Sequence, residues 1–581
     1  MRYNNWILLL ALVCVLITTK DATAQVDPEL PDLAPRELEI TGDLSIVFPA
    51  LRRQPIVGFN PPPRVPDIPG QRMPFADPYK QPSAELPPSP LVAPNPPDVN
   101  ALATRVPITG VIEGSLGKHL NRNVTADLAL ASTKATSVLL SGAYRGSNGI
   151  EPFSGSDASS GFDHLNGMMT LSHAMSNAQI ETSIAGFRNG YSLYGASLSA
   201  GSLALNNPER IFSGAHARIA LSSLPGSRIQ LTGALDLGMS SIGTDIFDPA
   251  IRVDPSSERD ESYLDFSTAA SFPIRDGNIR IVGNAVTSGL DDSGFPGSTV
   301  QSGYSEVALA YLYSKNLFLE GGLAAFGFAS DAQTDAGRSQ SLSYLSPVLK
   351  ATYSISPSVS WYVGNTPSIT SHLMKDAFKH APFLMDEPLL LPTLTALDAH
   401  TGMSLMSEYV TGQAQFGWKD QPFRRFAHRP SAGLASYVRG YAALAYDDAR
   451  MFYGRLDLAF ILRPGFQFGV DLEFRNAELT ELKSDIPYFS PLTAGGFLSA
   501  SFMDGRALIQ MNWRHEGLRP INLTGTTETQ SLTLISLSGT YFVSPAYGVS
   551  LGVRNLGSQP EFWDNYTSEA STVFFGAQYR W

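Results

Sequence analysis

Apolar and polar residues alternate along the chain from about Val106 to Trp581. The segment at 466–475 (FQFGVDLEFR) has apolar side chains at every second position and Gly or polar residues between them. Segments at 307–313, 452–463, 509–513 and 547–553 show the same period. A period of two is typical of β-strands with one apolar and one polar face. After residue 24, no stretch approaches the roughly 18 uninterrupted apolar residues of a transmembrane helix.

The connections between these segments alternate in length. Reading back from the C-terminus, residues 557–569, 516–527 and 477–492 form long connections. Between them lie short connections at 543–545, Asp504-Gly505 and Arg463-Pro464-Gly465. An antiparallel barrel in an outer membrane has turns on its periplasmic side and longer loops outside. The pattern therefore favours a membrane barrel over a soluble β-sandwich or propeller.

The last segment of the chain is the strongest signal for such a barrel. One face carries apolar side chains up to the terminal residue: Val573, Phe575, Ala577, Tyr579 and Trp581. This segment resembles the C-terminal recognition strand of bacterial outer-membrane proteins, which the barrel-assembly machinery reads. The resemblance implies that Val573, Phe575, Tyr579 and Trp581 form a barrel-assembly signal and that this machinery is a partner.

We therefore predict an all-β protein in which residues 106–581 form a transmembrane antiparallel β-barrel in contact with outer-membrane lipid. The number of strand-like segments is roughly 18–22, and an even number is expected when both termini lie in the periplasm. Gly and Ser obscure the alternation in the first half of the barrel.

The N-terminus has the pattern of a secretory signal. Arg2 supplies a positive charge, an apolar run follows from Trp6 to Thr18, and Ala22 and Ala24 form a small-residue cleavage site. We predict a signal peptide over residues 1–24 and localisation in a Gram-negative outer membrane. The only cysteine, Cys14, lies in this segment, so the mature chain is expected to have no disulfide or thiol.

Residues 25–105 form a separate Pro-rich segment. In the range 26–100, 19 residues are Pro, and each Pro removes a backbone hydrogen-bond donor. We predict an extended segment that lies in the periplasm or enters the lumen. Residues 26–100 could also contact a TonB-type or other periplasmic partner.

Composition and charge exclude several functions. A formal net charge of −12 provides no basic surface for nucleic acid, so no nucleic-acid partner is expected. His372 and His380 are eight residues apart in a predicted loop, which is not a metal-ligand spacing. We predict no catalytic residues, no cofactor and no metal site, and hence not an enzyme.

Two stretches resemble the barrel of TonB-dependent receptors of the type common among Bacteroidetes-like bacteria. The closing hairpin has an Asn555-Leu556 pair followed by an aromatic-rich loop with Phe562, Trp563 and Tyr566. Leu345 to Trp361 is similar to a mid-barrel strand pair of the family, and Ala381-Pro382-Phe383-Leu384 occupies the place of an Asn-Pro-like element. The resemblance implies a receptor-like barrel that takes up or binds a small solute.

The N-terminal segment departs from this family. Its receptors place a folded plug domain before the barrel, and residues 25–105 are too few and too Pro-rich for one. Residues 36–42 (RELEITG) faintly resemble a TonB box. We therefore expect a barrel related to these receptors but without the plug, and we expect part of residues 36–105 or the stretch 365–400 to enter the lumen.

Polar side chains of two neighbouring predicted strands form a candidate charge cluster in the lumen. If Leu462 lies opposite Phe466, then Arg455 lies opposite Glu473 and Asp457 opposite Asp471. Such a cluster could select solutes by charge, or it could form structural salt bridges. The cluster is made of Arg455, Asp457, Asp471, Glu473 and Arg475.

The stretch from Asn365 to His400 is longer than an ordinary connection and includes an amphipathic piece, Ser371 to His380. It could fold into the mouth of the barrel as a constriction or lid, or it could cover the outside.

Three functions remain open from the sequence. The first is a receptor-like or porin-like barrel for a small solute. The second is a non-transporting envelope scaffold that uses its Pro-rich segment as the contact. The third is a secreted soluble β-rich protein.

Overall fold

The structure is a computed structural model that describes most of residues 109–581. The residues left out within this range are 134, 152–158, 196–208, 225–226, 246–256, 276, 293–294, 332–339, 385–389, 430–441, 464, 557–560, 564–565 and 568–570. The predicted signal peptide with its cleavage site at Ala22 and Ala24, and the Pro-rich segment at 25–105, lie outside the described residues.

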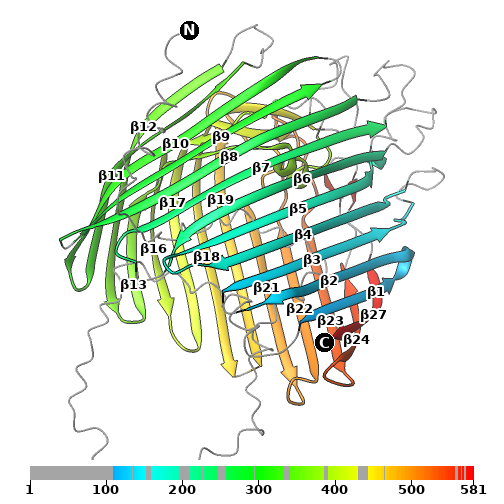
Figure 1. Cartoon of the computed structure of the whole chain (residues 1–581). Coiled ribbons are helices and arrows are strands. Elements are labelled where there is room, and N and C mark those ends of the chain that lie inside the picture. Colours follow the sequence, from blue (N-terminus) through cyan, green and yellow to red (C-terminus); the bar gives the residue numbers. More distant parts are fainter. Residues whose placement is uncertain are drawn as a thin grey trace, which may run out of the picture.

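The described residues form a closed antiparallel barrel of 22 strands (Figure 1), as the alternation predicts. The first and last strands close the ring, with Val111 opposite Arg580 and Gly117 opposite Phe574. The barrel strands are β1 (Gly110–Gly117), β2 (Asn121–Ser132), β3 (Thr136–Ser147), β4 (Phe162–Ala174), β5 (Ala178–Ser192), β6 (Glu209–Ser223), β7 (Gln230–Asp245), β8 (Ser257–Ile274), β9 (Gly277–Asp292), β10 (Phe295–Ser314), β11 (Leu317–Ser330), β12 (Gln340–Ser356), β13 (Val359–Asn365), β16 (Leu397–Met406), β17 (Val410–His428), β18 (Ala443–Arg463), β19 (Phe466–Leu479), β21 (Leu492–Phe502), β22 (Ala507–Glu516), β23 (Leu532–Phe542), β24 (Tyr547–Arg554) and β27 (Thr572–Arg580).

The other described elements are short and lie in the connections. These elements are a 3-10 turn (Lys118–Leu120), β14 (Ser368–Thr370), α4 (Met374–His380), β15 (Thr393–Thr395), β20 (Ser484–Asp485), β25 (Glu561–Trp563) and β26 (Tyr566–Thr567). Among the described residues, no helix is long and apolar enough to cross a membrane.

The two ends of the barrel differ in their connections. The long connections predicted at 477–492, 516–527 and 557–569 follow β19, β22 and β24 and therefore share one end, which we call the loop end. The short connections and the C-terminus lie at the opposite end, which we call the turn end. The predicted alternation of long and short connections is confirmed.

The outer face of the barrel is apolar. Predicted outward residues such as Val307, Leu309 and Phe474 are exposed, as a lipid-facing surface requires. Aromatic side chains gather near the turn end, as in the interfacial bands of membrane barrels. The exposed members of this band are Tyr311, Tyr313, Tyr353, Tyr409, Tyr541, Tyr547, Tyr579 and Trp581.

The register between β18 and β19 is partly as predicted. Arg455 lies opposite Glu473, and Asp457 lies opposite Asp471. The predicted pairing of Leu462 with Phe466 is wrong, because a register shift between Ile461 and Arg463 places Arg463 opposite Phe466. Such an irregularity leaves one extra residue on one strand, here Leu462, without a cross-strand partner.

The closing seam depends on a glycine beneath the terminal aromatic residue. The amide of Gly110 donates a hydrogen bond to the carbonyl oxygen of Trp581 (3.2 Å). A Cβ atom added to Gly110 would lie 2.7 Å from Cε2 of the Trp581 indole, whereas one added to Gly114 meets nothing within 4 Å.

We therefore expect Gly110→Val to displace Trp581 and to destabilise the closed barrel by about 1–3 kcal/mol, the usual cost of overpacking. Gly114→Val in the same strand is the matched control. The measurement is the temperature at which the unboiled protein loses its folded band on an SDS gel. Equal temperatures for the two variants would show that the packing of Trp581 on Gly110 does not stabilise the seam.

Candidate functional site

The connection between β13 and β16 turns into the barrel. These strands are neighbours, with Asn365 opposite Ala399, and the amide of Thr366 donates to the carbonyl oxygen of Asp398 (3.2 Å). A turn of a few residues would join them, so the rest of the segment is not needed for the connection. We call its described parts, residues 366–384 and 390–396, the lumen loop.

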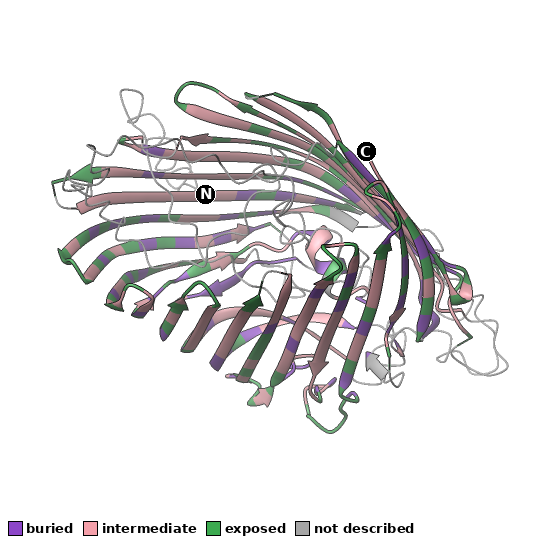
Figure 2. Ribbon diagram, turned by 90° about the horizontal axis from the view of Figure 1, so that it is seen from below, coloured by how far each residue is buried: buried purple, intermediate pink, exposed green. Residues whose placement is uncertain are grey.

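The lumen loop packs on strands from widely separated parts of the wall. Leu391 and Leu394 belong to a buried cluster with Phe326 of β11. Phe378 of α4 contacts Phe212 of β6, with 5.9 Å between their ring centroids. Figure 2, seen from below, shows α4 within the ring of strands. Of the two placements left open by the sequence, the structure shows the one in the mouth of the barrel.

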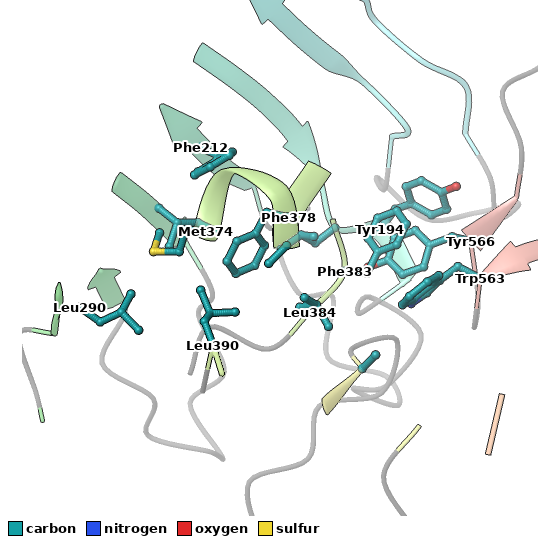
Figure 3. Close-up of a cluster of buried hydrophobic side chains, with 14 residues drawn as sticks. Tyr194, Phe212, Leu290, Met374, Phe378, Phe383, Leu384, Leu390, Trp563 and Tyr566 are labelled. Atoms are coloured by element: carbon teal, nitrogen blue, oxygen red, sulfur yellow. The ribbon is translucent and has the colours of Figure 1, made fainter. Parts of the chain in front are cut away.

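The sequence of α4 explains which side it buries. Met374, Ala377 and Phe378 are spaced three and four residues apart and are fully or almost fully buried. They form a core with Phe212, Ile242 and Leu290 from the barrel wall (Figure 3). Lys379, on the other side of the helix, is exposed.

A carboxylate of the wall caps the start of α4. The residue before the helix, Leu373, has no side-chain oxygen for this role. The amide of Met374 instead donates to Oε2 of Glu261 in β8 (2.8 Å), and the hydroxyl of Ser240 in β7 donates to the same oxygen (3.3 Å). A carboxylate at a helix N-terminus is favourable because the free amides there carry partial positive charge.

Arg210 of β6 anchors the residues that follow α4. Its side chain is completely buried, and its Nη1 donates to the carbonyl oxygens of Pro382 (2.6 Å) and Leu384 (2.8 Å). Its Nε donates to Thr244 Oγ1 (2.9 Å), and its guanidinium lies 5.2 Å from the ring centre of Phe378. One wall residue therefore ties down both the helix and the chain after it.

Lys375 forms a third link between α4 and the wall. Its ammonium group donates to the hydroxyl of Tyr263 (2.6 Å), lies 4.2 Å from that ring's centre and is 3.9 Å from Asp236 Oδ2. The hydroxyl of Tyr263 in turn donates to Asp236 (3.2 Å). The three residues form one polar network across α4, β7 and β8.

We expect Lys375→Met to weaken docking of α4 by about 1–3 kcal/mol, because it removes a hydrogen bond from a charged donor and a cation–π contact. Amide hydrogen exchange of residues 374–380 should rise. Lys379→Met, on the exposed side of the same helix, should leave exchange unchanged. The network would have no role in docking if both variants exchanged like the wild type.

An aromatic stack joins the lumen loop to two other loops at the same end. The ring of Phe383 stacks on Tyr566 (3.5 Å between centroids), and Trp563 stacks on Tyr488 (3.8 Å). Phe383 and Trp563 lie 5.9 Å apart, which connects the two pairs. Trp563 and Tyr566, which the family resemblance in the sequence assigned to an aromatic-rich loop, thus lie in the buried core of Figure 3.

The predicted lumen charge cluster separates into pairs within each strand. Arg455 Nε lies 2.8 Å from Asp457 Oδ2, and Arg475 Nη1 lies 3.9 Å from Glu473 Oε2. No hydrogen bond or ion pair joins Asp457 to Asp471 among the described residues. The cross-strand neighbours are therefore close in register, but the attractive contacts run along the strands.

No metal site is found in the described part of the chain, where no group of three or more His, Cys, Asp and Glu could hold an ion. His372 Nε2 is instead 2.9 Å from the hydroxyl oxygen of Thr393, a contact within the lumen loop.

Sequence reasoning missed the anchors of the lumen loop. Arg210 and Glu261 are separated from their loop partners by more than a hundred residues. One signal was present: both lie in strands longer than the 9–11 residues that cross a membrane, on the part near the loop end. Charged residues there face a lumen or mouth, but their partners cannot be read from a single sequence.

Comparison with protein-family models and with curated proteins finds no match. Several solved structures are similar to the barrel. The copper transporter OprC is 14% identical with a TM-score of 0.61, over 82% of this chain and 80% of that one. An iron transporter, FrpB from Neisseria meningitidis (F5-1 variant), is 11% identical with a TM-score of 0.63, over 82% of each chain.

The ferric yersiniabactin uptake receptor FyuA from Yersinia pestis is 11% identical with a TM-score of 0.59, over 81% of this chain and 80% of that one. Identities this low show the fold alone. The chain shares its barrel fold with these transporters and receptors, which supports the resemblance seen in the sequence at the level of fold.

Proposed function

We propose that this chain is an outer-membrane barrel that binds or takes up a small solute, with the lumen loop as the barrier at its outer mouth. The observation that carries the proposal is the lumen loop itself, which is held across the opening by contacts to β6, β7 and β8 on one side and to β11 on another. A barrel of 22 strands is wide enough that its lumen needs such an obstruction.

Two further observations support it. The exposed apolar face and aromatic band are what a lipid-facing surface requires and are not expected of a soluble propeller. The similar solved structures are named as transporters or receptors for copper, iron and ferric yersiniabactin, which agrees with uptake and with the expectation that the chain is not an enzyme.

Locking the lumen loop tests the proposal. The hydroxyl oxygens of Ser302 in β10 and Ser371 in the lumen loop are 2.6 Å apart, so cysteines at both positions would place their sulfur atoms within bonding reach. The only native cysteine, Cys14, lies in the predicted signal peptide and does not interfere in the mature protein.

We expect Ser302→Cys/Ser371→Cys in proteoliposomes to admit labelled small hydrophilic solutes about tenfold or more slowly when oxidised than when reduced, because movement of the loop opens the path. Ser302→Cys alone should be insensitive to oxidation. Equal flux in both redox states of the double variant would contradict the proposed barrier.

Several sequence-based expectations complete the proposal. The Val573, Phe575, Tyr579 and Trp581 face is proposed as the signal for the barrel-assembly machinery. The Pro-rich segment at 26–100 is proposed to contact a TonB-type or other periplasmic partner, and a scaffold function through that segment is the alternative. Capture of an envelope protein by residues 26–100, without any solute flux through the barrel, would favour the scaffold.

A further inference from the structure

Four arginines gather on the inner wall near the loop end. Phe474 is exposed on the outer face, so the strand alternation turns its neighbour Arg475 inward. We call the group the arginine cluster. Its members are Arg424 of β17, Arg475 of β19, Arg514 of β22 and Arg519 of the following loop.

The cluster contains more positive charge than its carboxylates neutralise. Glu516 forms ion pairs with two members of the cluster. Its Oε1 lies 2.5 Å from Arg514 Nη2, and its Oε2 lies 3.0 Å from Arg519 Nη1. Glu473 lies 3.9 Å from Arg475 Nη1, and Asp471 is close enough to Arg514 to interact with it electrostatically. Four guanidinium groups therefore face three carboxylates, of which only Glu516 and Glu473 lie within 4 Å of a guanidinium nitrogen.

Arg424 and Arg475 have few hydrogen-bond partners in the described part of the chain. Arg424 Nη1 donates to a neutral amide oxygen, Oε1 of Gln421 (2.5 Å). The Arg475 side chain makes no hydrogen bond to the described residues, and Nε of both arginines is buried without an acceptor among them. A guanidinium has five N–H donors, and a buried donor without an acceptor destabilises the folded protein.

The aromatic ring of Phe489 lies against the guanidinium groups of both Arg424 and Arg475. The Cζ atoms of Arg424 and Arg475 lie 4.9 Å and 4.3 Å from the ring centre of Phe489. Cation–π contacts stabilise the charges without using their N–H donors. The Arg475 side chain remains 11% exposed, so it is not fully sealed from solvent. Burial lowers the pKa of Arg519, although nearby Glu516 opposes the shift.

If these arginines had only a structural role, each guanidinium would be expected to pair with a carboxylate. Arg455, on the same inner wall, meets that expectation, since its Nε donates to Asp457 Oδ2 (2.8 Å). Arg424 and Arg475 have no such partner within hydrogen-bonding distance. Planar guanidinium groups with free donors match the geometry of carboxylate and phosphate oxygens.

We propose that the arginine cluster binds an oxyanionic group, a carboxylate or phosphate, of the solute that the barrel takes up. The inference rests on the proposed function for its biological role and names the chemical class of the solute. Arg424 and Arg475 supply the donors, Phe489 positions them, and Glu516 holds Arg514 and Arg519 at the edge of the site.

Binding of citrate and of inorganic phosphate to the full-length protein in detergent tests this, measured by calorimetry at low salt with choline as the cationic control. We expect saturable binding of at least one anion and none of choline. Arg424→Gln/Arg475→Gln should weaken anion binding about tenfold or more, because two charge-assisted contacts are lost. Arg455→Gln should bind like the wild type.

Folding of each variant is checked by its heat-modifiable band, and Arg475→Lys, which keeps the charge but not the planar fork, should bind with intermediate affinity. Wild-type binding that does not saturate, or unchanged affinity in the double variant, would overturn the proposal. Citrate and phosphate used separately tell a carboxylate site from a phosphate site. Because binding is measured without flux, the site can stand if uptake fails, and uptake can stand if the site fails.

Discussion

Replacing residues 367–395 with a Gly-Ser-Gly turn is expected to raise the conductance of the barrel in planar bilayers about tenfold or more, since a barrel this wide conducts unless its lumen is filled. The replacement is geometrically mild. Thr366 and Asp398 are already hydrogen-bonded, so the new turn only has to join two paired strands. The wall itself should be unaffected, and the protein should keep its heat-modifiable band.

A second variant separates the lumen loop from the N-terminal segment as the barrier. Removing residues 25–105 while keeping the lumen loop tests the other obstruction expected from the sequence. If the lumen loop is the barrier, the truncated protein should conduct like the full-length protein. Unchanged conductance after the loop replacement, with the barrel intact, would show that the lumen loop does not close the mouth.

Arg210→Met is expected to undock the lumen loop by about 3 kcal/mol or more, because two backbone carbonyls in a buried site lose a charged donor. The long apolar side chain keeps apolar packing against Phe378, so the loss is of the hydrogen bonds and of the cation–π contact to that ring. Amide exchange over 374–384 should accelerate about a hundredfold, since each 1.4 kcal/mol is roughly a factor of ten.

Arg188→Met in β5 is the control for removing an arginine from this part of the wall. Arg188 pairs with Asp163 at 3.3 Å, but both side chains are about half exposed. Exposed ion pairs contribute about 1 kcal/mol or less, so exchange in the lumen loop should not change. If Arg210→Met exchanged at the wild-type rate, Arg210 would not be the anchor of the loop.

The parts of this fold that follow local rules could be predicted from the sequence. Strand faces follow from alternation, so the outward positions of Val307, Leu309 and Phe575 could be assigned in advance. The long and short connections after β19, β22 and β24 are also local features. Arg455 and Glu473 could be paired because a hairpin register depends only on its own turn and faces.

The segment that forms the lumen loop could be recognised in the sequence, but whether it lies inside or outside the barrel could not be predicted. Its length marked it as unusual, and the amphipathic piece Ser371 to His380 contains the helix Met374–His380. Whether such a segment lies inside or outside depends on wall residues such as Arg210 and Glu261, which are distant in sequence. Nothing in the sequence near either residue identifies its partner.

The arginine cluster shows the same limit. Arg475 was singled out with Glu473 because both lie on a predicted polar face. Arg424 and Arg519 come from other elements and join Arg475 only when the barrel closes. A cluster assembled from three strands and a loop has no local signature, so the sequence indicated a charge pair where the structure shows an excess of positive charge.

Heat modifiability of the full-length protein, extracted from membranes and run on a cold SDS gel, tests the central claim most directly. A closed membrane barrel resists SDS until it is boiled, so we expect an unboiled band that migrates faster than the boiled one. A single band that does not shift, from protein recovered in the soluble fraction, would contradict the barrel and with it the lumen loop and the arginine cluster.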